Sequence, residues 1–179
     1  DLDIAPGEMV GLVGHSGSGK STLVNLICRF YDVSEGAILI DNVDIRQVSQ
    51  KSLRSKIGYV PQRSNLFTGT IESNLQFGDE NASADELLEA ASIAQVMDFI
   101  QSSPEGLQTE IAQGGSNVSG GQRQRLAIAR ALVIRAPIYI FDDSFSALDF
   151  KTDAALRRAL KQHISNSTVF IVSQRVATV

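Results

Sequence analysis

A glycine-rich segment at residues 14–22 constrains this chain more than any other feature of its sequence. The apolar run 8–13 before it predicts a buried strand, and the run 23–27 after it predicts the start of a helix. The segment fits the spacing G-x-x-x-x-G-K-[ST] and consists of Gly14, His15, Ser16, Gly17, Ser18, Gly19, Lys20, Ser21 and Thr22. Glycines let backbone N–H groups turn towards a phosphate, and a helix N-terminus adds a positive dipole. The segment therefore predicts a phosphate-binding loop.

Two side chains of this loop would carry the chemistry of a nucleotide site. Lys20 is expected to reach the outer phosphates, and the Ser21 hydroxyl is expected to ligate Mg²⁺. We take all nine residues, 14–22, as candidate nucleotide-binding residues. A glycine-rich turn that binds nothing would have no use for a helix that starts Lys-Ser-Thr, so that alternative has little support.

A second anion site is predicted further along the chain. Ser119 is a good N-cap, and the apolar spacing after it is helical, with Leu126, Ile128 and Leu132. A Ser-Gly-Gly sequence at a helix start offers a hydroxyl and backbone amides to a phosphate. The candidate residues are Ser119, Gly120, Gly121 and Gln122.

Two carboxylates follow a third characteristic segment. Residues 138–141 are apolar and predict a buried parallel strand, and Asp142 and Asp143 come directly after it. Because open α/β sheets bind ligands at the carboxyl ends of their strands, both carboxylates are candidates for one site.

These segments resemble, in order and over nearly the whole chain, the motifs of the ATP-binding cassette (ABC) ATPases. Residues 59–62 resemble the Q-loop of that family, and residues 146–149 resemble its D-loop, which crosses a dimer interface. The resemblance implies an α/β fold: a P-loop NTPase (RecA-like) core with a mostly parallel sheet plus an inserted α-helical subdomain. We expect residues 1–62 and 131–179 to form the ATP-binding core, and residues 63–130 to form the helical subdomain that carries the signature motif.

The same resemblance implies roles for individual residues. Asp142 would hold Mg²⁺ through water, beside Ser21 and Gln62. Asp143, Gln62 and Gln174 take the positions of the catalytic residues. Residues 119–122 resemble the signature motif, which in the family contacts the γ-phosphate bound by the opposite subunit. ATP and Mg²⁺ are the implied ligands, and a second cassette is the implied partner.

Two segments resemble the exporter type of this family, residues 65–75 and residues 104–110. Residues 109–115 take the place of the exporters' X-loop, which touches the coupling helices of transmembrane domains. That motif normally carries a glutamate where this chain has Gln113. We therefore expect transmembrane domains as partners and a location at the cytoplasmic face of the cell membrane.

The chain departs from the exporter pattern at two positions of its own ATP site. Asp143 stands where the family usually has a glutamate, and it is one methylene shorter. Gln174 stands where a histidine normally follows the strand, and glutamine cannot carry a proton at neutral pH as imidazole can. The signature residues 119–122 are intact. This pattern resembles the half of a heterodimeric bacterial exporter whose own site is degenerate, meaning that it binds ATP and hydrolyses it slowly.

The remaining pattern predicts ordinary secondary structure. Ser83 is a predicted N-cap with an acidic first turn after it, and residues 96–100 begin another short helix. Strands are expected at residues 37–40, 57–60 and 168–172, with a helix at 152–164 and a parallel main sheet. Residues 1–4 are expected to lie inside a strand before the Pro6-Gly7 turn. Because the family's adenine-stacking aromatic lies further upstream, we expect a trimmed cassette or a fragment of a longer polypeptide.

Composition limits the classes of function. At 179 residues the chain is long enough for one domain with a core, and a net charge of −4 does not support nucleic-acid binding. Cys28 is alone, so it forms no disulfide framework and is expected to pack at the first helix. No apolar run approaches the roughly 20 residues that span a bilayer. A solvated helix face is expected for the basic residues Arg123, Arg125, Arg130 and Arg135.

Three alternatives stay open within this interpretation. The chain could form a homodimeric exporter in which Asp143 works as a poorer base. It could belong to a soluble ABC ATPase that acts on DNA or ribosomes, although no coiled-coil insertion or strongly basic surface is present. It could also act as an ATP-gated regulatory clamp without hydrolysis.

Overall fold

Four parallel strands form the central sheet of this protein. The computed structural model describes residues 2–174. The strands lie in the order β1 (Met9–Val13), β8 (Thr168–Ser173), β7 (Ile138–Asp142) and β4 (Ile57–Val60). Each neighbouring pair is parallel, which confirms the predicted sheet. The carboxyl ends of the strands therefore meet at one edge, where the loops that follow them gather.

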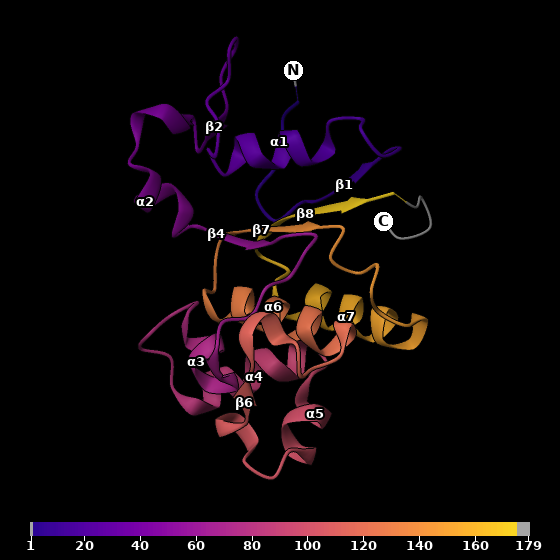
Figure 1. Ribbon diagram of the computed structural model, residues 1–179. Coiled ribbons are helices and arrows are strands. Elements are labelled where there is room, and N and C mark those ends of the chain that lie inside the picture. Colours follow the sequence, from indigo (N-terminus) through magenta and orange to yellow (C-terminus); the bar gives the residue numbers. More distant parts are fainter. Residues whose placement is uncertain (1, 175–179) are drawn as a thin grey trace.

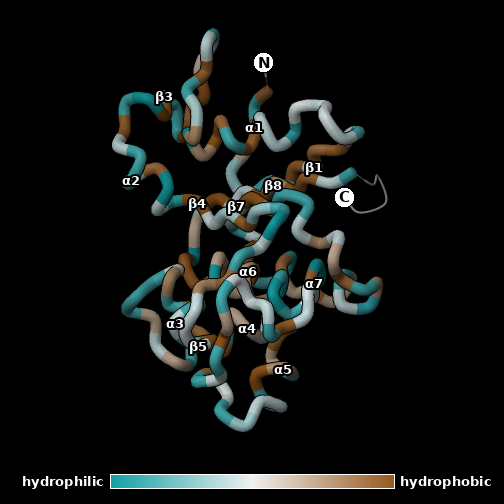
Figure 2. Tube along the Cα trace, in the orientation of Figure 1, coloured by the Kyte–Doolittle hydropathy of each residue, from teal (hydrophilic) through white to brown (hydrophobic). Residues whose placement is uncertain are grey.

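Helices cover both faces of this sheet (Figure 1). α1 (Lys20–Ile27) and α2 (Gln50–Arg54) lie on one face, and α6 (Gly120–Val133) and α7 (Phe150–His163) lie on the other. Successive side chains of a strand point to opposite faces, so Ile140 joins the cluster that contains α1, whereas Phe141 joins the cluster that contains α6 and α7. Figure 2 shows the hydrophobic residues concentrated along these strands. The phosphate loop is thus attached to a well-packed α/β layer.

A second group of helices packs against α6, away from the sheet. It contains α3 (Ile71–Gln76), α4 (Ala84–Ile93) and α5 (Met97–Ser102), with a small antiparallel pair of β5 (Gly69–Thr70) and β6 (Glu110–Ile111). Short 3₁₀ turns, η2 (Gly106–Gln108) and η3 (Gln113–Gly115), precede α6. Capping boxes begin α4 at Ser83 and α6 at Ser119. Both predicted N-caps are therefore confirmed.

The strand predicted before the phosphate loop is present as β1, but its predicted burial is wrong, and two further strand predictions near the N-terminus need correction. β1 is not buried: Met9 is 49% exposed and Val13 is 39% exposed. Among the described residues β1 packs mainly against β8, whereas β4, the strand at the other edge, is covered by α2 and α6. Residues 2–4 form no strand, and Asp1 lies outside the described residues. The predicted strand at 37–40 shortens to β2 (Leu39–Ile40), which pairs with β3 (Val43–Asp44) and leads to the 3₁₀ turn η1 (Ile45–Gln47).

The arginines of α6 do not form the solvated face that the sequence suggested. Arg123 donates to the Gly114 carbonyl at 3.0 Å, and Arg125 donates to the Gln95 carbonyl. Arg130 donates to the Asn65 carbonyl at 3.0 Å, with its guanidinium 5.3 Å from the centre of the Phe67 ring. These side chains hold loops against the helix. Only Arg135, which pairs with Glu86 and Glu89, fits the expected exposed position.

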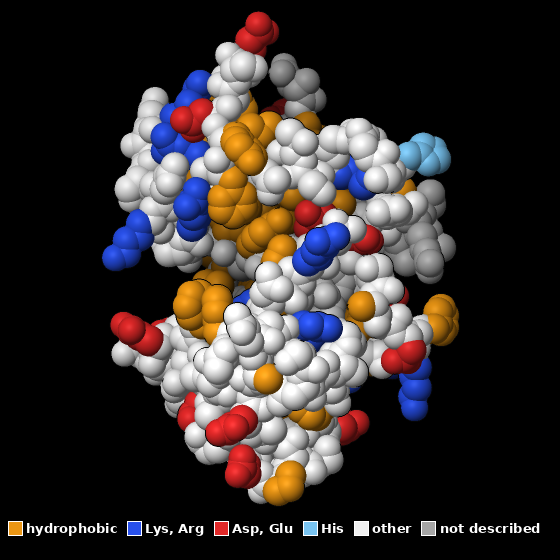
Figure 3. Space-filling view, in the orientation of Figure 1, with side chains coloured by type: hydrophobic (Ala, Val, Ile, Leu, Met, Phe, Trp, Pro, Cys, Tyr) orange, Lys and Arg blue, Asp and Glu red, His pale blue; other side chains and the backbone are white. Residues whose placement is uncertain are grey.

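Apolar side chains also gather on one exposed face of the protein (Figure 3). Exposed apolar residues lie after the end of α1 (Phe30 and Tyr31) and in the β2–β3 hairpin (Leu39 and Val43). Arg54 lies over the Phe30 ring, 4.9 Å from its centre. Cys28 is buried beside them, as expected, and burial raises the pKa of its thiol to about 12. Among residues 2–174, no helix is long and apolar enough to cross a membrane.

Candidate functional site

The phosphate loop connects β1 to α1 with a backbone that suits an anion. Gly17 and Gly19 have φ angles of 80° and 88°, in the left-handed region that glycine adopts without strain. Apart from the neighbouring residues of the chain, no heavy atom lies within 4 Å of an ideal Cβ at either glycine, so the space beside both glycines is open. α1 has no side-chain cap and no acidic residue in its first turn. Its first N–H groups and its dipole therefore remain available to a phosphate.

Lys20 crosses this loop at the start of α1. Its Nζ donates to the carbonyls of Gly14 and His15, both at 2.7 Å, and lies 3.2 Å from Ser18 Oγ. The ammonium group thus sits at the mouth of the loop, on the same turn as Ser21. A cation in this position can pair with the outer phosphates of a nucleotide.

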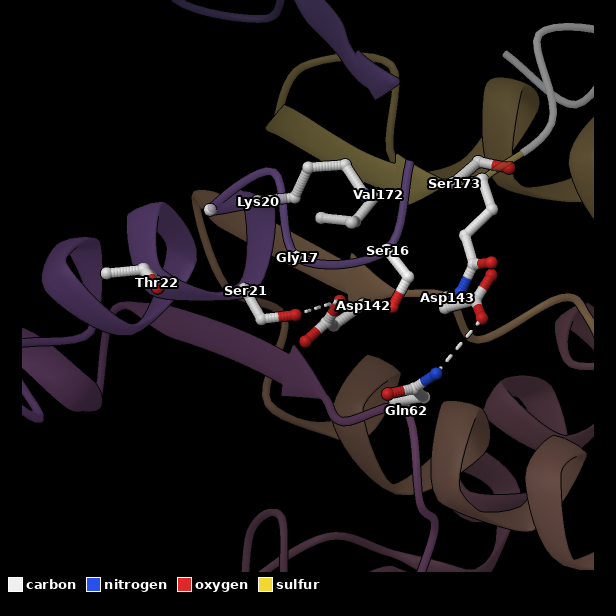
Figure 4. Close-up of a pocket in the computed structure, with 12 residues that line it drawn as sticks. Ser16, Gly17, Lys20, Ser21, Thr22, Gln62, Asp142, Asp143, Val172 and Ser173 are labelled. Atoms are coloured by element: carbon white, nitrogen blue, oxygen red, sulfur yellow. Dashed lines mark hydrogen bonds between the residues drawn. The ribbon is translucent and has the colours of Figure 1, made fainter. Parts of the chain in front are cut away.

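The hydroxyl of Ser21 meets the carboxylate at the end of β7. Ser21 Oγ donates to Asp142 Oδ1 at 3.3 Å (Figure 4). Burial raises the pKa of Asp142 and the nearby Asp143 charge adds to this effect, while the Ser21 hydrogen bond and the Lys20 charge oppose it. A divalent cation beside Asp142 would favour its charged form.

This donor set fits Mg²⁺ better than it fits a metal that needs a full protein cage. Among the described residues, no three His, Cys, Asp or Glu side chains gather as metal ligands. Mg²⁺ commonly keeps several waters and takes one or two protein ligands together with substrate phosphates. Ser21 and Asp142 supply such a pair, next to a loop that suits those phosphates.

Gln62 and Asp143 face each other across the same cavity. Gln62 Nε2 donates to Asp143 Oδ2 at 3.2 Å, and Gln174, exposed at the end of β8, lines the same wall. The cavity has a volume of about 220 Å³. Its lining residues are Ser16, Gly17, Gly19, Lys20, Ser21, Thr22, Gln62, Asp142, Asp143, Val172, Ser173 and Gln174. The structure therefore brings the phosphate loop together with all the predicted metal-side and catalytic positions.

The second predicted anion site lies elsewhere. Ser119 Oγ accepts from the Gln122 N–H at 3.2 Å, and Gln122 Oε1 accepts from the Ser119 N–H at 2.8 Å. An ideal Cβ at Gly120 meets nothing within 4 Å, so this helix start is open. None of residues 119–122 lines the cavity of the phosphate loop. The two helix starts predicted to bind anions are therefore separate in this chain.

Sequence reasoning missed three polar contributors around the cavity. Ser173 lines its wall, Ser144 is buried directly after Asp143, and Ser64, two residues after Gln62, donates to Gln124 Oε1 at 2.7 Å. Only Ser173 carried a usable signal, because it lies between the predicted strand 168–172 and Gln174. The other two contacts join segments 60 or more residues apart.

The loop after β1, the carboxylates at the end of β7 and the parallel sheet define a P-loop nucleotide-binding domain of the α/β class. Comparison with protein families gives a finer assignment, since the family described as "ABC transporter" matches residues 1–146. The chain belongs to the ABC transporter family.

Individual relatives support the exporter resemblance. The chain is 51% identical to an "Uncharacterized ABC transporter ATP-binding protein" of Mycobacterium tuberculosis, over 98% of this chain and 30% of that protein. It is 45% identical to the "ATP-dependent lipid A-core flippase" of Chromobacterium violaceum, over 100% of this chain and 31% of the flippase. A solved structure of a bacterial Atm1-family ABC exporter with ATP bound superposes with a TM-score of 0.95 at 44% identity, over 99% of this chain and 31% of that one. The chain thus spans about 30% of the length of these relatives.

Proposed function

We propose that this chain is the ATP-binding cassette of an exporter, which dimerises around MgATP and powers transport through associated transmembrane domains. The observation that carries the proposal is the shared cavity. Lys20, Ser21, Asp142 and Gln62 all line it, together with glycines of the phosphate loop. Lys20 binds the outer phosphates, and Ser21 and Asp142 hold Mg²⁺. The metal supplies charge compensation for the phosphoryl group, and the side chains of this chain align it.

We infer that the site on this phosphate loop is degenerate. Asp143 keeps the negative charge of a catalytic carboxylate but reaches less far than glutamate, and its Oδ2 accepts a hydrogen bond from Gln62. Gln174 at the end of β8 can donate a hydrogen bond without carrying a proton. Since alignment and charge compensation do most of the work in phosphoryl transfer, these changes affect hydrolysis more than binding. The ATP on Lys20 is therefore held long and hydrolysed slowly.

The signature residues serve a different ATP. Ser119, Gly120, Gly121 and Gln122 begin α6 outside the cavity of their own phosphate loop, and they are open to an incoming group. In a head-to-tail pair with a second, non-identical cassette, they complete the partner's site, where hydrolysis proceeds. Residues 1–62 and 131–179 act as the ATP-binding core of this arrangement, and residues 63–130 as its helical subdomain.

The proposed membrane partners dock at the helical side of the cassette. Glu110 and Gln113 are exposed in the 109–115 segment, which resembles the exporters' X-loop. The flippase and the Atm1-family exporter are more than three times as long as the matched region, which leaves room for transmembrane domains in proteins of this kind. The cassette then works at the cytoplasmic face of the membrane.

Steady-state ATPase activity of the intact transporter with Asp143→Asn tests the degenerate site. The change keeps the size of the side chain and removes its charge. Asp41→Asn is a matched control, because Asp41 is exposed and has a similar left-handed backbone, with φ of 51° against 49° for Asp143. We expect both variants to keep most of the turnover. Turnover near zero with Asp143→Asn alone would identify Asp143 as a working base and favour a homodimeric exporter.

A further inference from the structure

A buried hydroxyl joins the two strands that lead to Gln62 and Asp143. Ser144 is fully buried, and its Oγ lies 3.0 Å from the Val60 carbonyl and 3.3 Å from the Asp142 carbonyl. A serine hydroxyl has one proton to donate, so it is shared between these two acceptors, with the shorter contact to Val60. The hydroxyl thus connects the end of β4 to the end of β7.

The backbone at Asp143 explains how Ser144 reaches this position. Asp143 has a φ of 49°, in the left-handed region that aspartate tolerates better than most residues. Its N–H still donates to the Val172 carbonyl at 3.0 Å, so the chain turns only after the last link to β8. After this turn Asp143 lines the cavity, whereas the Ser144 side chain is buried.

The position of Ser144 matters because the β4–β7 pairing stops there. The parallel register of the two strands ends at Val60 opposite Phe141. Gln62 follows Val60 by two residues, and its amide must stay within 3.2 Å of the Asp143 carboxylate. The Ser144 hydroxyl supplies the link beyond the last strand pair, directly before the segment that carries Gln62.

The far side of that segment is attached to a different element. Ser64 donates to Gln124 at 2.7 Å, and Arg130 donates to the Asn65 carbonyl at 3.0 Å, so residues 64 and 65 follow α6. Without the Ser144 link, the placement of Gln62 would depend mainly on α6 and less on β7. The position of Gln62 therefore depends on both attachments, the one to β7 before it and the one to α6 after it.

We propose that Ser144 is a positioning residue, which holds the start of the Gln62 segment against the end of β7 and so sets Gln62 beside the metal-side carboxylates. The proposal rests on the proposed function, in which Gln62 and Asp142 act on the Mg²⁺ side of bound ATP. It predicts that Ser144 affects nucleotide binding only when Mg²⁺ is present.

Photolabelling of this chain by 8-azido-ATP in the intact transporter tests the proposal, with Mg²⁺ and with EDTA in parallel. Ser144→Ala is expected to weaken the apparent affinity about fivefold with Mg²⁺, the effect of losing one hydrogen bond, and to leave it unchanged in EDTA. Ser167→Ala is the matched control, because Ser167 Oγ donates to the Ala136 carbonyl at 2.9 Å near the opposite end of β7. It should behave like wild type in both conditions.

A comparison in the Gln62→Ala variant distinguishes an effect of Ser144 on the position of Gln62 from a general loss of structure. In Gln62→Ala, the additional change Ser144→Ala should no longer alter the Mg²⁺-dependent affinity. An equal effect with and without Gln62, or an equal effect in EDTA, would overturn the proposal. Ser144→Cys keeps a weak donor of similar volume, and it replaces the alanine variant in the same comparisons if that variant does not assemble.

The outcomes also separate this inference from the proposed function. If wild type shows no saturable labelling of this chain in either condition, the proposed function fails and the inference falls with it. If wild type is labelled with Mg²⁺ dependence and Ser144→Ala matches it, the inference alone is wrong.

Discussion

If the site on this phosphate loop is degenerate, as proposed, replacing Asp143 by glutamate should make it hydrolyse ATP faster. The proposed partner site must first be silenced, and Gly120→Asp does this within the same chain. No heavy atom lies within 4 Å of a Cβ at Gly120, so the fold should accept aspartate at the start of α6. Its carboxylate would repel the phosphate that the signature residues contact. The turnover that remains then reports the site on Lys20.

The expected gain follows from the reach of the carboxylate. Asp143 Oδ2 accepts from Gln62 Nε2 at 3.2 Å, and one more methylene moves the charge on the order of 1 Å further into the cavity. A displacement of about 1 Å can change a rate about 10²-fold. Because Gln174 still lacks an imidazole, we expect about tenfold from glutamate alone and up to about a hundredfold when Gln174→His is added. The left-handed backbone of Asp143 suits glutamate less and should cost about 1 kcal/mol of stability.

Phosphate release at saturating MgATP measures this effect in the intact transporter. The comparison is between Gly120→Asp alone, Gly120→Asp with Asp143→Glu, and the triple variant that also contains Gln174→His. If glutamate leaves the residual turnover unchanged, the reach of the carboxylate does not limit the site, and the reasoning from side-chain length is refuted.

Two further predictions concern stability. Burial raises the pKa of Asp142, so its charge destabilises the folded state above that pKa, and this penalty disappears in acid. Asp142→Asn should therefore raise the melting temperature at neutral pH but not at pH values near or below 4. The same change should abolish Mg²⁺-dependent nucleotide binding. A neutral-pH melting temperature below wild type would contradict this sign. A Cβ at Gly58 would lie 2.5 Å from Tyr139 Cδ1. The Tyr139 ring cannot easily move away, because its hydroxyl accepts a hydrogen bond from the Ala136 N–H. Gly58→Ala should therefore lower the stability of the folded protein by about 2 kcal/mol. Gly120→Ala, which meets open space, should melt like wild type.

Local signals in the sequence were sufficient for much of the fold. The capping boxes at Ser83 and Ser119 depend on residues three positions apart, so the pattern shows both partners together. The parallel sheet follows from strands separated by helices, and the cavity follows from the rule that loops gather at the carboxyl ends of such strands.

The burial of individual strands and the long-range polar contacts could not be predicted from local sequence signals. The run that forms β1 is as apolar as that of a central strand, but burial depends on which elements cover a strand. Among residues 2–174, β1 packs mainly against β8, whereas the other edge strand, β4, is covered by α2 and α6. Nothing in the sequence distinguishes Arg130 from a surface arginine, because its contacts with the Asn65 carbonyl and the Phe67 ring join segments far apart in the chain. Ser144 reaches Val60 across 84 residues, and only the turn at Asp143 makes that contact available.

The length of α6 has a mechanical consequence. Its 14 residues make a rod of about 21 Å, with the signature residues at one end and its other end packed near β4. A pivot of about 10° at the β4 end would move Ser119 by about 4 Å, which exceeds the length of a hydrogen bond. In the proposed pair of cassettes, a small tilt of α6 against the sheet would therefore be enough to make or break contact with a phosphate on the facing cassette.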